Sequence, residues 1–337
     1  MQALLDPAIL FFLLGVIAGL LKSNLEIPPP ISRFLALYLL MALGLKGGFA
    51  LAHSGLTREV ATGLACAVAL AVVVPVLGYT VLRRFLAPFD AAAVAATYGS
   101  VSAVTFITAI QYMEANDLAF GGHMSAAMAL MESPAIILAV LLANNLRQRT
   151  SAASGTPQGG AMALPLPSAA RGGSSLGKVL HESFTDGAQL LLLGAMVVGM
   201  LLGDDGKVAM QPFSGDLFKG MLAFFLLDMG VMAARNMPHI RGQSPWVYVY
   251  AVLGPVLHAA LALGLGAAAG LSAGDTGLLM VLAASASYIA VPAVLRYAMP
   301  EANASLYFGL SLGLTLPLNI LVGIPLYVGV AQRVLAP

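Results

Sequence analysis

Two short polar clusters interrupt apolar stretches of the sequence: GSVSAVT at 99–105 and ASASYIAVP at 284–292. Polar groups inside a membrane are costly and usually mark function. Gly and Pro weaken a helix at such a point, and Ser and Thr can satisfy the backbone groups that a break frees. The N–H groups that open at a broken helix attract anions, so we predict one small-anion site formed by both clusters. The candidate anion-binding residues are Gly99, Ser100, Val101, Ser102, Ala103, Thr105, Ser285, Ala286, Ser287 and Tyr288.

A cation that accompanies the anion would need oxygen ligands near the same clusters. Glu132 precedes Pro134 in the segment MESPA, and a carboxylate in an apolar segment needs either Na⁺ or a proton. Thr315 and Asn319 in LTLPLN carry further oxygens. The candidate cation ligands are Glu132, Ser102, Ser287, Thr315 and Asn319. The alternatives are that the hydroxyls only allow close helix packing and that Glu132 is hydrogen-bonded for structure.

Other polar residues have simpler expected roles. Lys46 and Asp228 occupy related segments and are predicted to form a structural ion pair, and His258 is expected to be a packed polar residue. A phosphate-binding GxxxxGK[ST] loop, a HExxH motif, paired cysteines and a GxSxG motif are all absent from the sequence. ATP-driven transport and enzymatic activity are therefore not expected, and no cofactor is predicted apart from a coupling Na⁺. An intramembrane enzyme would need a Ser–His or paired-Asp constellation.

The composition identifies the environment in which these residues act. Of 337 residues, 59% are hydrophobic and only 9% are charged, whereas soluble domains carry about 25% charged residues. Most of the surface must therefore face lipid. The net charge of +1 argues against a nucleic-acid partner, which would need clustered basic residues. Cys66 is the single cysteine, so an intrachain disulfide is impossible.

Apolar runs long enough to cross a membrane predict about ten helices. Their expected ranges are 7–21, 31–52, 59–82, 91–113, 120–146, 179–203, 213–234, 246–270, 276–298 and 303–332. The first range has no basic start and carries Asp6, so we expect a retained helix rather than a signal peptide.

A Gly-, Ser-, Pro- and Ala-rich stretch at 149–177 separates two comparable halves and is expected to be a flexible linker. If both termini lie outside the cell, most of the 16 Lys and Arg residues fall on the cytoplasmic side together with the linker.

The two halves also repeat each other at a nearly constant shift. Pro75 aligns with Pro255, and Pro134 aligns with Pro317. The serines align too, Ser100 with Ser285 and Ser102 with Ser287. Because five crossings are an odd number, the second half enters the membrane inverted, as in secondary transporters. We predict an all-α integral membrane protein of two inverted five-helix repeats with interrupted helices crossing near the midplane. The predicted divisions are 1–148, 149–177 and 178–337.

The sequence resembles the SbtA family of sodium-dependent bicarbonate transporters over nearly its whole length, although it looks unlike the cyanobacterial members. The resemblance rests on LGLKGGFAL, YGSVSAVT, MESPA, HESF, AASASYIAVPAVLR, EANASLYFG and GIPLYVGVAQ. It implies a five-plus-five inverted design, a homotrimer, bicarbonate and Na⁺ bound near the paired polar segments, and a PII-like regulator on the cytoplasmic side.

The resemblance also assigns residues one by one. The first polar segment matches at Gly99, Ser102 and Thr105, and the second matches at Ser285, Ser287, Ile289, Pro292 and Arg296. The sequence departs from the cyanobacterial pattern where Tyr288 replaces an Asp, where Ala103, Val104, Ala286 and Ala290 replace other residues, and where Glu132 replaces an Asp.

These observations predict a Na⁺-coupled bicarbonate transporter of a bacterial plasma membrane that works by alternating access. Tyr288 and Glu132 favour an alternative, a transporter of the same fold that carries another small anion or couples to protons. A membrane scaffold or sensor whose linker recruits a PII-like regulator is an alternative from a different class.

Overall fold

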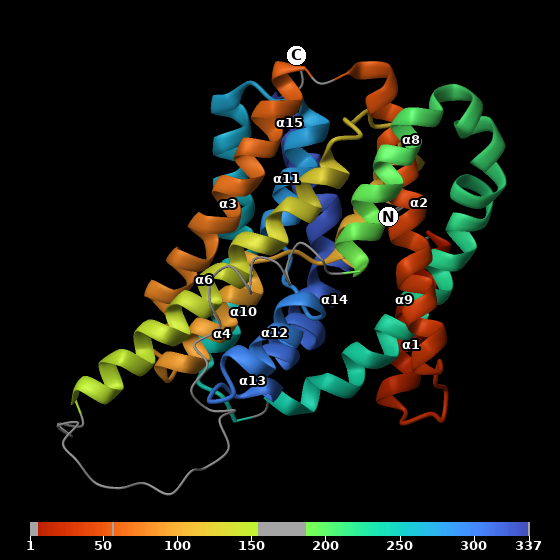
Figure 1. Cartoon of the computed structure of the whole chain (residues 1–337). Helices are drawn as coiled ribbons and strands as arrows, with labels where there is room; N and C mark the ends of the chain where they lie inside the picture. Colours follow the sequence, from red (N-terminus) through yellow and green to blue (C-terminus); the bar gives the residue numbers. More distant parts are fainter. Residues whose placement is uncertain (1–5, 56, 154–186, 241, 336–337) are drawn as a thin grey trace, which may run out of the picture.

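The computed structural model describes residues 6–55, 57–153, 187–240 and 242–335, and within these ranges the chain is all α-helical (Figure 1). The predicted linker at 149–177 and the HESF segment fall largely or wholly outside the described residues.

Among the described residues of the first half, six helices follow one another, and two of them share a single predicted range. Its helices are α1 (Pro7–Leu20), α2 (Pro29–Ser54), α3 (Arg58–Leu82), α4 (Pro88–Gly99), α5 (Ala103–Ala115) and α6 (Met124–Ala153). Thr57 caps the start of α3 by accepting a hydrogen bond from the Val60 amide. The range predicted as one helix at 91–113 therefore contains two helices, α4 and α5, which meet inside the first polar cluster.

The second half follows the same order. Its helices are α8 (Gly187–Gln211), η3 (Pro212–Asp216), α9 (Leu217–Asn236), η4 (Met237–Ile240), α10 (Pro245–Ala269), α11 (Ala273–Ala284), α12 (Ala290–Ala298), α13 (Ala304–Phe308), η5 (Gly309–Thr315), α14 (Leu316–Leu318), η6 (Asn319–Gly323) and α15 (Ile324–Leu335). The range predicted at 276–298 is again two helices separated by the polar cluster. The last pass is a continuous helical run in which η5 and η6 are π-helical.

The helices pack into two groups, which Figure 1 shows side by side. We call α1, α2, α8 and α9 the panel, and the remaining helices the central bundle. Within the panel, α1 packs along α9 and α2 packs along α8, each pairing one helix from either half. Glycines allow this close approach, because a Cβ on Gly15 would lie 2.1 Å from the Leu227 carbonyl oxygen and one on Gly48 would lie 2.1 Å from the Met196 carbonyl oxygen.

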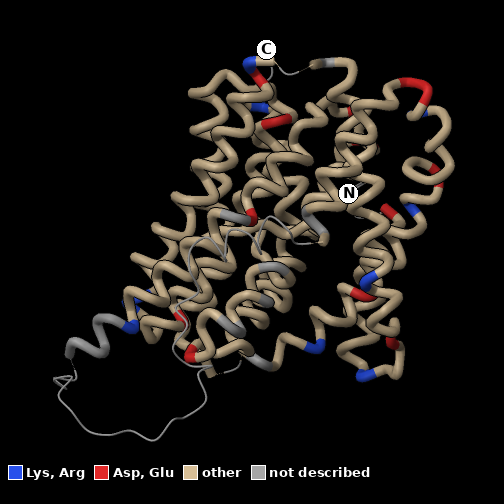
Figure 2. The backbone as a smooth tube through the Cα atoms, in the orientation of Figure 1, with Lys and Arg blue, Asp and Glu red and all other residues tan. Residues whose placement is uncertain are grey.

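The helices are suited to a membrane. Among the described residues, seven helical stretches are long and apolar enough to cross a bilayer, and the apolar α1 and α11 are shorter. One of these stretches, Leu190–Asn236, contains both α8 and α9, and α8 is kinked at Gly203, where φ is 55° and ψ is −139° (Figure 1). Charged residues gather toward the two ends of the helices, with few between them (Figure 2). Exposed side chains in the middle of the helices include Val72, Val76 and Leu257, which are suited to contact lipid.

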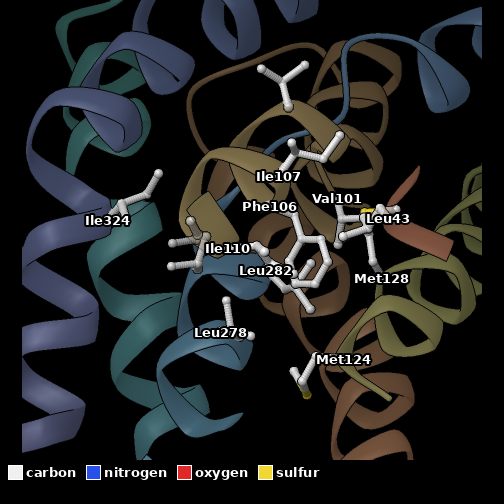
Figure 3. Close-up of a cluster of buried hydrophobic side chains, with 14 of the residues drawn as sticks. Leu43, Val101, Phe106, Ile107, Ile110, Met124, Met128, Leu278, Leu282 and Ile324 are labelled. Atoms are coloured by element: carbon white, nitrogen blue, oxygen red, sulfur yellow. The ribbon is translucent and has the colours of Figure 1, made fainter. Parts of the chain in front are cut away.

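A layer of apolar side chains supports the helix breaks. Figure 3 shows Phe106 and Ile110 of α5 beside Leu278 and Leu282 of α11, and all four belong to one buried cluster. Each of these side chains is at most 2% exposed. Inside a membrane such side chains gain van der Waals packing rather than removal from water, so the two broken passes are held together by close apolar packing as well as by polar contacts.

Candidate functional site

The first break is a three-residue extended segment between α4 and α5. Ser100 ends α4 with φ −97° and ψ −177°, a β conformation that an α-helix cannot continue. Ser102 is the N-cap of α5, and its hydroxyl accepts hydrogen bonds from the Thr105 amide at 3.2 Å and the Thr105 hydroxyl at 3.0 Å. The polar residues of this cluster therefore create the break and also close the helix that follows it.

The second break is a five-residue segment, 285–289, between α11 and α12. Ser285 ends α11 in an extended conformation, and its hydroxyl donates to the Leu282 carbonyl oxygen at 2.8 Å. At the other end, Ile289 occupies the N-cap position of α12 and provides no side-chain hydrogen bond. The Ser287 hydroxyl accepts a longer bond from the Val291 amide, at 3.4 Å. Pro292, the third residue of α12, has no amide hydrogen, so the start of α12 presents fewer amide donors than the start of α5.

The two breaks are joined by a reciprocal pair of hydrogen bonds. The Ser102 amide donates to the Ser285 hydroxyl at 2.9 Å, and the Ser287 amide donates to the Thr97 carbonyl oxygen at 2.8 Å. Residues nearly 190 positions apart in the chain are therefore in direct contact. The structure brings both predicted polar clusters together at one place.

Most candidate anion-binding residues are buried at this junction. Those less than 9% exposed are Gly99, Ser100, Val101, Ser102, Thr105, Ser285, Ala286, Ser287 and Tyr288, and Ala103 is half-buried. The Tyr288 hydroxyl interacts with the Ser102 hydroxyl and lies 3.5 Å from the Met229 sulfur of α9. The neighbouring Ile289 is 56% exposed, so the second break has an accessible edge that the buried serines lack.

Two predicted cation ligands lie on the last pass, beside the end of α11. The Asn319 amide group donates to the Ala284 carbonyl oxygen at 2.8 Å, directly before the second break. The Thr315 hydroxyl pairs with the Tyr98 hydroxyl at 2.6 Å and donates to the Ala251 carbonyl oxygen at 3.3 Å. Thr315 ends η5 and Asn319 begins η6, and π-helical turns within α-helices often occur at functional sites.

Glu132 lies on a different helix from the other four predicted cation ligands. It is half-buried on α6, which contacts α12. Of the other four predicted cation ligands, Ser102 and Ser287 lie in the breaks and Asn319 bonds the residue before the second break, whereas Thr315 bonds Tyr98, two residues before the first break. Arg296 lies on α12 among residues whose side chains the structure does not describe.

The sequence analysis missed an aromatic cluster behind the first break. Tyr98, Tyr250 and His258 pack edge-to-face, with ring centroids 5.2–6.5 Å apart. His258 is 4% exposed, which confirms the prediction that it is a packed polar residue. Gly78 leaves room for the Tyr250 hydroxyl, since a Cβ there would lie 2.5 Å away. In the sequence, the one feature that pointed to this region was Pro255, which lies between Tyr250 and His258 and aligns with Pro75.

The predicted ion pair between Lys46 and Asp228 is wrong. Lys46 instead pairs with Glu114 of α5 at 3.0 Å, and its ammonium nitrogen lies 4.3 Å from the centre of the Phe218 ring. Asp228 accepts a short hydrogen bond from the Ser32 hydroxyl. The two residues were matched because their segments repeat each other, but a repeat does not determine which helices are neighbours in space.

Comparison with known proteins extends this result. The sequence profile of the Na⁺-dependent bicarbonate transporter superfamily matches residues 7–332. The match therefore covers both polar clusters and the final helical pass. No curated protein matches the chain.

Proposed function

The chain belongs to the Na⁺-dependent bicarbonate transporter superfamily, and we propose that it takes up bicarbonate together with Na⁺ by alternating access. The observation that carries this proposal is the reciprocal pair of hydrogen bonds between the breaks, Ser102 to Ser285 and Ser287 to Thr97. Broken helices that meet inside a membrane are how secondary transporters build ion and substrate sites. The membrane-spanning helices and the transporter family both favour transport over enzymatic catalysis.

The architecture that fits this function is the predicted pair of inverted five-helix repeats. Support comes from the matching helix orders of the two halves and from the reciprocal packing of α1 on α9 and α2 on α8. In such folds one helix group moves against the other around the bound substrate. Here the moving parts would be the panel and the central bundle.

We assign the anion to the second break. The start of α12 lies at this break, and the helix dipole there stabilises a negatively charged ligand. The hydroxyls of Ser102 and Ser287 lie at the same junction. Bicarbonate is a compact anion with three oxygens, one of which carries a proton, so it can accept from amides and donate to a hydroxyl.

The described residues also fit a Na⁺ ion. The side-chain oxygens Ser100 Oγ and Asn319 Oδ1 are buried and have no hydrogen-bond partner among the described residues. Such oxygens are costly unless they find a ligand, and hard cations take oxygen ligands. Asn319 and Ser100 would hold the ion near the breaks, with Thr315, Ser102, Ser287 and Glu132 as the other proposed ligands. The bound ion would supply positive charge that offsets the charge of the anion.

The cellular setting is proposed on the resemblance and on the distribution of positive charge. We propose a homotrimer in a bacterial plasma membrane, with both termini outside and the central linker in the cytoplasm. A PII-like regulator would bind on the cytoplasmic side.

The test is uptake of ¹⁴C-bicarbonate into proteoliposomes with and without an inward Na⁺ gradient. The proposal predicts accumulation that requires Na⁺ and competes with unlabelled bicarbonate. Folded, correctly inserted protein that accumulates no bicarbonate under either condition would contradict it.

A second candidate, proton coupling or another small anion, is favoured by one observation: the uncharged Tyr288 lies buried at the junction. Uptake that follows a pH gradient and ignores Na⁺ would select this candidate. A scaffold or sensor, by contrast, would retain its partner but show no uptake of any anion.

A further inference from the structure

Asp228 is a buried carboxylate that the site described above does not use. It is 6% exposed and lies on α9, inside a stretch long and apolar enough to span a membrane. The four ion pairs among the described residues all involve other groups. A charge at such a position is expensive without a counter-charge, so this carboxylate calls for a positively charged ligand.

The position of Asp228 relates it to the second break. The next residue, Met229, contacts the Tyr288 hydroxyl at 3.5 Å. The Tyr288 phenol is itself within electrostatic range of the Asp228 carboxylate. Asp228 therefore lies where the panel meets the central bundle, close to the proposed anion site.

The surrounding groups do not cancel its charge. Arg235 lies on the same helix and acts on Asp228 electrostatically, but its guanidinium donates to the carbonyl oxygens of Ser23 and Leu25. Glu26 opposes the effect of Arg235. From α2, Ser32 contributes a neutral hydroxyl that donates to the carboxylate.

We propose that Asp228 is a Na⁺ ligand on the panel side of the site, with the Ser32 hydroxyl oxygen beside it. Hard cations bind carboxylate and hydroxyl oxygens, and the Ser32 hydroxyl can rotate to present a lone pair. This inference rests on the proposed function, because the Na⁺ bound here is the ion that accompanies bicarbonate.

The location gives the ion a specific effect. Ligands on the panel and an anion held by the central bundle are drawn together when Na⁺ lies between them. The ion therefore favours the conformation in which α9 contacts the second break.

The test is direct binding of ²²Na⁺ to the purified full-length protein, without transport. Asp228→Asn keeps the shape and still accepts the Ser32 hydrogen bond, so the fold is expected to survive. The affinity for Na⁺ should fall at least about tenfold. Asp216→Asn is the matched control, because Asp216 is an exposed carboxylate at the start of the same helix, and its affinity should equal that of the wild type.

A second variant keeps the carboxylate. Ser32→Ala removes one proposed oxygen ligand and should weaken Na⁺ binding about threefold, which can be measured even if Asp228→Asn does not fold. Wild-type affinity in Asp228→Asn or in Ser32→Ala would overturn the inference and leave Na⁺-coupled uptake intact. A wild-type protein that binds no Na⁺ would overturn both the inference and the proposed function.

Discussion

The two breaks have similar sequences, but the helices that follow them, α5 and α12, have different N-caps. At the first break, Ser102 closes the start of α5 with its own hydroxyl. At the second, Ile289 offers no cap to α12 and is exposed, while Ser287 reaches only the Val291 amide at 3.4 Å. The start of α5 is therefore fixed by a side-chain cap, whereas the start of α12 has no cap at Ile289 and contains Pro292, which has no amide hydrogen. The difference teaches that two segments of one sequence repeat can begin their helices in different ways.

The two breaks also differ in how closely the end of the preceding helix packs against its neighbours. Gly99 ends α4, and a Cβ there would lie 2.5 Å from the Pro75 ring. The related position at the end of α11 is Ala284, which already carries a Cβ and is fully buried. The first break is therefore packed against α3 so closely that only glycine fits, while the second break tolerates a side chain.

The largest expected effect comes from filling the first break. Ser102→Leu removes the α5 cap and places a larger group against Ser285. Bicarbonate uptake should fall about 100-fold, equivalent to about 2.7 kcal/mol, while the protein remains folded by gel filtration. Thr80→Leu is the control, since Thr80 is exposed and bonds only within its own helix. Wild-type uptake by Ser102→Leu would remove this residue from the site.

Gly99→Ala should mainly reduce stability. The added methyl group meets the Pro75 ring, and overpacking of this kind costs about 1–3 kcal/mol. Thermal unfolding in detergent should therefore occur at a lower temperature. Ala284→Gly is the reciprocal change. It should not raise the unfolding temperature, because the Ala284 methyl group makes no clash that its removal could relieve. If Gly99→Ala unfolds at the wild-type temperature, the difference in packing between the breaks is not real.

Replacing each capping serine by alanine separates structure from binding. Ser102→Ala removes an N-cap and should cost about 1 kcal/mol of stability. Ser287→Ala loses only a long hydrogen bond, so its melting temperature should stay near that of the wild type while its apparent affinity for bicarbonate weakens. Equal melting temperatures together with equal affinities would contradict the difference between the starts of α5 and α12.

The smallest effect concerns the far end of α12. Arg147 of α6 donates to the Ala298 carbonyl oxygen and to both carboxylate oxygens of Glu301, each at 2.8 Å. This pairing lowers the pKa of Glu301 below its ordinary value of 4.5. The contribution to stability is therefore present above pH 4.5 and is lost as the pH falls through the pKa in the folded protein.

Because the pair is partly exposed, Glu301→Gln should cost less than about 1 kcal/mol. The difference in melting temperature from the wild type should be small at pH 7 and vanish in acid. A difference that grows on acidification would contradict this account.

The sequence predicted the helical passes well, because apolar length alone identifies them. It also placed both breaks correctly, since Gly and Ser inside an apolar run mark where a helix cannot continue. The predicted ion pair between Lys46 and Asp228, which was based on the internal repeat, was wrong. The π-helical turns around Thr315 and Asn319 were also missed, because a π-turn differs from an α-turn only by one extra residue within the hydrogen-bonded turn and has no strong composition signal.

Sequence by itself determined the membrane character, the helical regions, the two polar interruptions and the family. These follow from composition and from local backbone preferences, which act over a few residues. The tertiary structure alone decided that Ser102 meets Ser285, that Lys46 pairs with Glu114, and that Asp228 meets Ser32. Such contacts depend on how helices distant in the chain pack against one another, and that packing is set by the shapes of whole helix surfaces.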